Sequence, residues 1–510
     1  MNARILAVIA CAGAIFCNNV LAQRTASLTI LHYNDFHAQY LPLKVSRTDS
    51  TGKVTSYDVG GAATFKAFLN ALSKSDTNAV ILNAGDNFQG TPVSSITRGD
   101  ADITMMNLLS PDVTTLGNHE FDYSIDTLRV RLQKLCVPIV SANLWDTKYG
   151  KSFVPPTIVI TVGDVKIGII GLAPPNLARL TTRENIRGLK VLNLMKTVKN
   201  SIRELRLKEK PNLIVVLSHM GVPMDSILAT KEKNIDIIIG GHSHTALFVP
   251  KKVNHTVICQ AGVSSRYLGE LRLQVDLDGD SLLTYSGRLV ETVNGVYPAD
   301  TKVAALVDSL ESIVGPALNR VIGTLAVRWE RKYNQESNIG NWHTDAMRRF
   351  GKTDIAFLNS GSLRKDMDPG AIRIRDIWEI DTFGDELDTF EVTGSQLRGI
   401  LEWQVSDKRE LFQVSGLAYT FDGRKPQGQR LISALVNGKP IDPHRRYSIT
   451  VNSFTADHLH DFFGLPEANI KINHCGTADR DVFIHEVEQQ KIITSAVEGR
   501  IVNIDPGPAH

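Results

Sequence analysis

The chain is poor in cysteine, in net charge and in long apolar stretches, and each shortage excludes a class of protein. Only 5 of its 510 residues are cysteines, and Cys136, Cys259 and Cys475 are too widely spaced for a disulfide framework. Whether one bridge forms among these three stays open. A net charge of +2 gives no indication of a nucleic-acid or membrane-surface partner. The remaining composition is that of a folded globular protein.

The N-terminus has the pattern of an export signal. Arg4 precedes a mostly apolar stretch, Ile5–Phe16, and Val20-Leu21-Ala22 supplies small residues at a cleavage site. Residues 1–22 are therefore predicted to be a signal peptide, and the mature protein to be periplasmic or extracellular. The stretch is shorter than the roughly 20 residues that span a bilayer. Val8-Ile9-Ala10-Cys11 loosely resembles a lipobox, but Cys11 comes so early that lipid anchoring is disfavoured.

The length indicates at least two domains. From Ser27 to about Val290, short apolar strands alternate with helix-like stretches, which predicts an α/β layer fold for residues 23–295. Strands are predicted at Leu28–Tyr33, Ala79–Asn83, Val137–Ser141, Val165–Gly171, Leu213–Leu217 and Ile235–Ile239. Residues 296–320 are predicted to form a linker helix, because apolar residues recur at helical spacing after Asp300. Residues 321–510 are predicted to form a second domain with its own core.

Five polar motifs follow apolar runs in the first domain, where ligands bind in α/β sheets. They are Asn34-Asp35-Phe36-His37, Gly85-Asp86-Asn87, Gly117-Asn118-His119-Glu120, Ser218-His219-Met220-Gly221 and Gly240-Gly241-His242-Ser243-His244. Singly, each has an ordinary explanation as a turn, a helix cap or a surface histidine. Five together, all at predicted strand ends, favour a hydrolytic site with two divalent metal ions.

The motifs supply Asp, Asn and His, the ligands that divalent metals bind. The predicted ligand set is Asp35, His37, Asp86, Asn118, His219, His242 and His244. Asp86 suits a bridging position between ions about 3.5–4 Å apart, since it follows an apolar strand on a glycine turn. Mixed N/O sites suit Zn, Mn, Fe, Co or Ni, so the pattern does not fix the metal.

His119 and Asp122 are spaced so that their side chains can touch at the start of a helix. Asp122 would then fix the imidazole of His119 and favour its charged form. A cationic His119 beside two metals would stabilise phosphoryl charge or protonate the leaving oxygen. The alternative makes Asp122 a residue that only starts the helix.

Together these motifs resemble those of the calcineurin-like metallophosphoesterases, and the whole chain resembles the secreted 5′-nucleotidase family. The resemblance implies a four-layer α/β/β/α sandwich joined to an α+β C-terminal domain that binds the substrate. It also implies that Asp35, His37, Asp86 and His244 hold one metal, that Asp86, Asn118, His219 and His242 hold the other, and that His119 and Asp122 form the catalytic dyad. The dyad and the ligand set agree with the interpretation from the residues alone.

The second half carries the family's substrate loops. Asn359-Ser360-Gly361-Ser362-Leu363-Arg364 is similar to the family's Asn-Gly-Gly-Gly-Ile-Arg loop, so Arg364 is expected to bind phosphate. Asn359 belongs to the same loop, and Arg348 or Arg349 is a candidate second arginine. The alternative role for Arg364 is a surface ion pair. Thr382-Phe383-Gly384 resembles a loop whose Phe stacks on the base.

One loop departs from the family pattern. The family carries Gly-Gly-Asp-Gly and an aromatic as its second stacking loop, whereas this chain has Asp457-His458-Leu459-His460-Asp461-Phe462. Phe462 falls at the position of the stacking aromatic, but the glycines that allow close backbone approach are missing. The base preference is therefore left open. His458 and His460 are interpreted as members of an exposed loop, rather than as a further metal pair.

These observations predict an exported dimetal phosphohydrolase that cleaves phosphate esters of nucleotides by in-line attack of a metal-bound hydroxide. The expected partner is a small-molecule nucleotide or other phosphate ester, with no nucleic acid and no membrane span. Rival enzymes would hydrolyse nucleotide sugars, cyclic nucleotides or non-nucleotide phosphates. A rival of another class is a protein that binds nucleotides without turnover. The oligomeric state is not predicted.

Export is expected to remove residues 1–22 and to leave Gln23 as the new N-terminus, because the apolar stretch is short and ends in Val20-Leu21-Ala22. Mass spectrometry of the secreted protein measures this directly. A mature chain that begins with a lipid-bearing Cys11 would overturn both the cleavage site and the unanchored localisation.

Overall fold

The computed structural model describes residues 23–48, 52–406, 410–466 and 470–504. The predicted signal peptide lies outside these residues. Across the described ranges, every helix is too short or too polar to cross a bilayer. Cys136, Cys259 and Cys475 are all free thiols, so no bridge links them.

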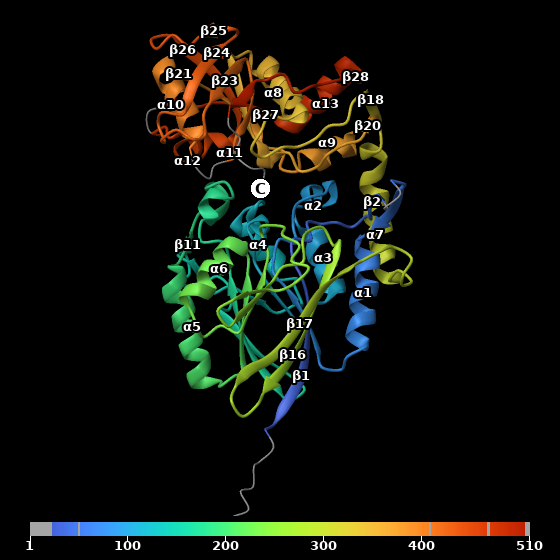
Figure 1. Ribbon diagram of the computed structural model, residues 1–510. Helices are drawn as coiled ribbons and strands as arrows, with labels where there is room; N and C mark the ends of the chain where they lie inside the picture. Colours follow the sequence, from blue (N-terminus) through green and yellow to red (C-terminus); the bar gives the residue numbers. More distant parts are fainter. Residues whose placement is uncertain (1–22, 49–51, 407–409, 467–469, 505–510) are drawn as a thin grey trace, which may run out of the picture.

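Two six-stranded sheets form the N-terminal half (Figure 1). The first sheet has the order β17 (Ser281–Glu291), β16 (Tyr267–Asp276), β1 (Thr25–Tyr33), β4 (Ala79–Asn83), β5 (Val113–Thr115) and β6 (Ile139–Val140). The second has the order β14 (Lys251–Val253), β15 (Thr256–Cys259), β13 (Ile237–Gly240), β12 (Leu213–Ser218), β10 (Val165–Leu172) and β9 (Thr157–Val162).

The two sheets stack face to face with helices on both outer sides. Leu28 and Ile30 of β1 pack in the core between the sheets, whereas Leu31 and Tyr33 pack outward against α1 (Ala62–Lys74) and α3 (Asp100–Leu109). This alternation follows from the period of two in a strand. On the far side, α5 (Leu194–Lys208) and α6 (Val222–Lys231) cover the second sheet. The N-terminal half is thus the expected α/β/β/α sandwich.

The predicted ligand motifs lie at one edge of this sandwich. β1, β4, β5 and β6 are parallel, and so are β10, β12, β13 and β15. Parallel strands bring their carboxyl ends to the same edge, so the loops after β1, β4, β5, β12 and β13 converge there. These loops begin with Asn34, Ala84, Leu116, His219 and Gly241. The edge faces the C-terminal half (Figure 1).

A long helix, α7 (Thr301–Leu318), follows the first half. The Asp300 carboxylate caps it by accepting the backbone N–H groups of Lys302 and Val303. Its buried residues pack in the core that also holds α1 and α3, and Ile374 and Trp378 of the second half lie against the same core. Glu311 of α7 also forms an ion pair with Arg375. The helix predicted after Asp300 is therefore present and touches both halves.

The C-terminal half is α+β. Its largest sheet has the order β22 (Phe412–Ser415), β19 (Ile355–Asn359), β26 (Arg446–Asn452), β21 (Glu386–Thr393) and β27 (Asn473–Ala478). One core packs this sheet against α10 (Gly394–Gln404) and α12 (Leu459–Phe463), and another packs α8 (Asn338–Gly351) and α13 (Asp479–Gln490) against its other face. The turn after β19 and the short helices α11 (Ser453–Ala456) and α12 lie toward the N-terminal half (Figure 1).

Candidate active site

The loops that carry the predicted ligands have unusual backbone conformations. The φ angle is 50° at Asp35, 49° at His37, 53° at Asp86, 76° at His242 and 53° at His244. Residues with a Cβ rarely adopt this left-handed region, and each such residue costs about 1–3 kcal/mol. The strain lets residues that follow straight strands turn their side chains toward a common point.

One cluster consists of Asp35, His37 and His244, whose ligand atoms all lie within 4.8 Å of one another. Asp35 Oδ1 lies 3.7 Å from His37 Nε2 and 3.3 Å from His244 Nε2. Asp35 is fully buried, and its carboxylate accepts the backbone N–H of His242 at 2.9 Å. The loops after β1 and β13 are therefore joined through this carboxylate.

A second cluster consists of Asp86, His219 and His242, again within 4.8 Å of one another. His219 Nε2 lies 2.8 Å from Asp86 Oδ2 and 3.7 Å from Asp35 Oδ1, so His219 connects the two clusters. Asp86 Oδ1 accepts the backbone N–H of His119 at 2.9 Å, which places the Asn118-His119 turn beside it. All seven predicted ligands thus come from loops that meet at this edge.

The tautomers of two histidines can be read from their neighbours. His37 Nδ1 lies 3.0 Å from the carbonyl oxygen of Gln89, and His219 Nδ1 lies 2.7 Å from that of Ala84. Carbonyl oxygens only accept, so each Nδ1 carries a hydrogen and each Nε2 is turned toward the cluster. This is the arrangement of histidines that bind metals, in which the second ring nitrogen is held by a backbone carbonyl.

The buried Asn118 Oδ1 has no hydrogen-bond partner, and the near neighbours of His219 Nε2 are carboxylate oxygens of Asp86 at 2.8 Å and of Asp35 at 3.7 Å. Burial disfavours a charge on the His219 imidazole, but the carboxylates of Asp86 and Asp35 outweigh it and raise the pKa of His219 to about 10. The clusters thus combine carboxylates, imidazole nitrogens and an orphaned amide oxygen, and together they attract positive charge. This donor set fits divalent cations with mixed N/O ligands.

His119 lies between the clusters and the cavity. Its Nδ1 is 2.7 Å from Asp122 Oδ2, so the contact expected from their spacing is present. Burial opposes a charge on His119, but Asp122 and then Asp86 outweigh it and raise the pKa of His119. His119 also forms a third cluster with His37 and Asp86, whose ligand atoms lie within 4.8 Å of one another. In this cluster His119 Nε2 is 4.0 Å from Asp86 Oδ2. Histidines that bind metals also donate their second ring N–H to carboxylates, so the hydrogen bond to Asp122 fits both the dyad and the ligand role.

Glu120 organises the turns beneath Asp86, a function that the sequence analysis did not assign. Its buried carboxylate accepts the backbone N–H groups of Asn87 and Gly117, both at 2.7 Å. Burial and the Asp86 charge raise the pKa of Glu120 to about 7. Gly117 has no space for a side chain, because a Cβ there would lie 2.0 Å from Asp86 Oδ1. Glu120 directly follows His119 in the sequence, and this position within the motif could have indicated its structural role.

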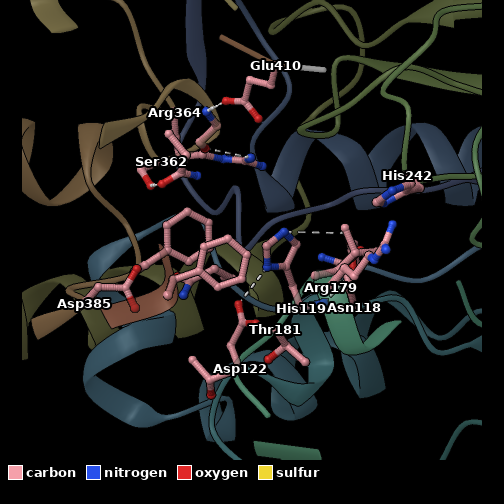
Figure 2. Close-up of a pocket in the computed structure, with 18 of the residues that line it drawn as sticks. Asn118, His119, Asp122, Arg179, Thr181, His242, Ser362, Arg364, Asp385 and Glu410 are labelled. Carbon is pink, nitrogen blue, oxygen red and sulfur yellow. Dashed lines mark hydrogen bonds and ion pairs between the residues drawn. The ribbon is translucent and has the colours of Figure 1, made fainter. Parts of the chain in front are cut away.

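A cavity of about 800 Å³ opens from the clusters and is lined by both halves of the chain. Figure 2 shows His119 and Asp122 on one side, with Arg364 and Glu410 above them. The four predicted substrate residues, Asn359, Arg364, Phe383 and Phe462, all line this cavity. Burial raises the pKa values of two further lining carboxyls, Asp385 and Glu410, to about 7.

The two predicted stacking aromatics occupy different surroundings. Phe383 stacks on His119 with ring centroids 5.6 Å apart and planes 28° apart, and the Arg364 guanidinium carbon lies 5.7 Å from the Phe383 centroid. Phe462 instead packs against Phe454, with centroids 5.5 Å apart. Phe383 therefore belongs to the immediate surroundings of the dyad, whereas Phe462 lines the part of the cavity formed by α11 and α12.

Three expectations about the second half are corrected by the structure. Arg348 donates to Ser415 Oγ at 2.7 Å and Arg349 pairs with Glu486 at 2.6 Å, and neither lines the cavity. In the second half, Arg331 lines the cavity together with Arg364 and donates to the carbonyl oxygen of Arg364 at 2.6 Å. No motif in the sequence singled out Arg331.

The third correction concerns the loop that departs from the family pattern. His460 is exposed, as expected, with 64% of its side chain accessible, but His458 is fully buried. The interpretation of both histidines as an exposed loop is therefore wrong for His458. Its ring contacts Phe454 and the carbonyl oxygen of Ala178, which belongs to the N-terminal half.

Comparisons with known proteins agree with this two-part architecture. Residues 28–246 match the calcineurin-like phosphoesterase family, and residues 321–465 match the 5′-nucleotidase C-terminal domain. The chain is 31% identical to an apyrase of Tabanus yao, over 94% of both chains. It is 26% identical to a 5′-nucleotidase of Bos taurus, over 94% of this chain and 91% of the relative.

A solved structure gives the same result in three dimensions. The crystal structure of a 5′-nucleotidase precursor from Thermus thermophilus superposes with a TM-score of 0.85 and 30% sequence identity, and covers 94% of this chain and 100% of that one. The converging ligand clusters, the cavity between two matched domains and these similarities lead to one conclusion. The chain belongs to the 5′-nucleotidase family of metal-dependent phosphoric ester hydrolases.

Proposed function

We propose that the protein is an exported 5′-nucleotidase-type enzyme that hydrolyses phosphate esters of nucleotides with two divalent ions. The observation that carries this proposal is a single cavity that joins the metal-ligand clusters to an arginine and to aromatic rings of the C-terminal half. Its volume of about 800 Å³ suits a ligand of nucleotide size, since small-molecule sites usually measure about 300–1,000 Å³. Relatives named 5′-nucleotidase support the choice of substrate.

The residues present fit a pair of ions. We assign Asp35, His37, Asp86 and His244 to one ion, and Asp86, Asn118, His219 and His242 to the other. This division keeps each of the two matching clusters intact and gives the unpartnered Asn118 Oδ1 a role. When bound, the ions would activate water and neutralise the charge on the phosphoryl group. Zn and Mn both suit these mixed ligands.

The chain's own residues would bind and orient the ester. His119 faces the cavity and, held by Asp122, donates a hydrogen bond or a proton to the phosphoryl or leaving oxygen. Arg364 provides a fixed positive charge on the opposite side, close to Phe383. Phe383 shields the dyad from water, and Phe462 offers an aromatic surface to the base.

Phosphate release from a substrate panel tests the proposal. With Mn²⁺ or Zn²⁺ supplied, AMP or ADP should be hydrolysed with a higher kcat/KM than UDP-glucose, 2′,3′-cyclic nucleotides or an aryl phosphate. A marked preference for UDP-glucose or a cyclic nucleotide would replace the proposed substrate with that rival. Equal activity on the aryl phosphate and on nucleotides would indicate a non-nucleotide phosphatase.

Asp86→Asn is expected to lower kcat by about 10³-fold or more, because the charge between the two clusters would no longer hold both ions. Phosphate release and metal content per chain measure the effect. Asp126→Asn is a matched control, since the Asp126 side chain is 80% exposed. A variant that keeps two ions and near-normal turnover would contradict the bridging role of Asp86.

Asp122→Asn is expected to lower kcat by about 10²–10⁴-fold and to move the alkaline limb of the pH–rate profile to lower pH. Asp122 raises the pKa of His119, so its removal lets His119 lose its proton at a lower pH. Metal content should stay unchanged in this variant and in His119→Ala. Loss of metal from His119→Ala would show that His119 is a ligand.

Phe462→Ala is expected to raise the KM for nucleotides by about 5- to 100-fold, since stacking on a base contributes about 1–3 kcal/mol, while the KM for an aryl phosphate changes little. Arg364→Ala should weaken both substrates, because both carry the phosphoryl charge. Phe350→Ala and Arg349→Ala are matched controls outside the cavity. An unchanged KM for nucleotides in Phe462→Ala would show that Phe462 does not stack on the base.

A further inference from the structure

His458 joins the two halves of the protein at the rim of the cavity. It lies between α11 and α12, where the family pattern has glycines, and its side chain is fully buried. Its Nε2 is 2.9 Å from the carbonyl oxygen of Ala178, and its Nδ1 is 2.7 Å from that of Phe454. Both contacts end on oxygens that only accept, so the ring donates to one of them when it is neutral and to both when each nitrogen carries a hydrogen. A glycine has neither bond to offer.

The segment on the other side of this contact also forms part of the cavity. Ala178 lies in the short helix η2 (Leu177–Arg179), and the following residues Leu180, Thr181 and Thr182 line the cavity wall. Arg179 lines it too and forms an ion pair with Asp461 of α12 at 2.8 Å. The His458 and Asp461 contacts therefore attach one short helix of the C-terminal half to one wall of the metal-bearing half.

The hydrogen bond from His458 to Ala178 is better shielded from water than the ion pair between Arg179 and Asp461. The Arg179 side chain is 64% exposed, and ion pairs between exposed groups contribute little because water screens them. The His458 ring is buried, whereas Ala178 is exposed, so water screens this hydrogen bond from one side only. Of the two contacts between α12 and η2, the one made by His458 is therefore the less exposed.

His458 also sets the position of Phe462. The Phe462 backbone N–H donates to the His458 carbonyl oxygen at 2.9 Å, and the two rings meet edge to face with centroids 5.9 Å apart. The His458 ring lies 4.8 Å from the Phe454 ring, and both phenylalanines line the cavity. Replacing the His458 ring would therefore alter the packing of Phe454 and Phe462 in the cavity, as well as the contact between the halves.

We propose that His458 is a positioning residue that fastens α12 to η2, holds the C-terminal half over the metal clusters and orients Phe462 for the nucleoside. The expected effects on nucleotide kinetics rest on the function proposed above, whereas the attachment of the two halves does not depend on it.

The native cysteines provide a direct measure of this attachment. Cys136 in the N-terminal half and Cys475 in the C-terminal half are exposed, and Cys259 is buried, so spin labels can be placed on the first two in a chain that begins at Gln23 and therefore lacks Cys11 and Cys17. The distribution of distances between the labels reports the relative position of the halves. His458→Phe keeps a ring but removes both ring nitrogens, His458→Gln keeps one donor, and His460→Ala is the matched control on the exposed side of α12.

Wild-type protein and His460→Ala should show one narrow distance distribution, His458→Phe a broader or shifted one, and His458→Gln an intermediate one. The kcat/KM for AMP should fall about tenfold in His458→Phe, partly recover in His458→Gln and stay unchanged in His460→Ala, with metal content constant. Circular dichroism identifies any variant that does not fold. If His458→Phe does not fold, the comparison of His458→Gln with wild type tests the proposal.

Folded His458 variants with the wild-type distance distribution would overturn the proposal, whatever their activity. A changed distribution in a protein that hydrolyses no nucleotide would leave the attachment standing and refute only the proposed substrate. A wild-type distribution in His458→Phe together with a changed one in His458→Gln would show that ring volume rather than hydrogen bonding holds the halves, which would also overturn the proposal.

Discussion

The arrangement of the whole molecule depends on buried carboxylates and imidazoles held close together at the edge of two stacked sheets. Asp35 and Asp86 are buried and lie within 4 Å of histidine nitrogens from several loops. Such groups are costly to bury unless charge is balanced, and divalent cations balance it. These ligands are kept at one point by the strained loops, by the glycine turns and by the Glu120 carboxylate, which accepts backbone N–H groups of two turns.

The cavity joins this edge of the first half to side chains of the second half. The first half contributes the ligands, His119 and Asp122, and the second contributes Arg364, Phe383 and Phe462 from loops on a separate sheet. Phe383 stacks directly on His119, so the second half contacts the first half beside the ligand clusters. Chemistry and substrate choice are therefore linked by the position of the C-terminal half, which the contact of His458 with Ala178 helps to fix.

The sequence predicted that the candidate ligand loops follow strand ends, because the determinants of those strands and turns are local. Ala79–Asn83 was predicted with its observed bounds, since an apolar run ends there before a glycine turn. The hairpin of β16 and β17 was not among the predicted strands, because charged residues interrupt its apolar pattern. The burial of His458 could not be predicted either, since it depends on a carbonyl group 280 positions earlier in the chain. Arg331 likewise reaches the cavity only through the tertiary fold.

The most direct test of the account is the position of bound metal. Crystals grown with Mn²⁺ or Zn²⁺ and measured for anomalous scattering should show two peaks about 3.5–4 Å apart. One peak should lie among Asp35, His37 and His244, and the other among Asn118, His219 and His242, with Asp86 between them. A single peak, or a peak coordinated by His119, would contradict the two-ion centre and the separate role of the dyad.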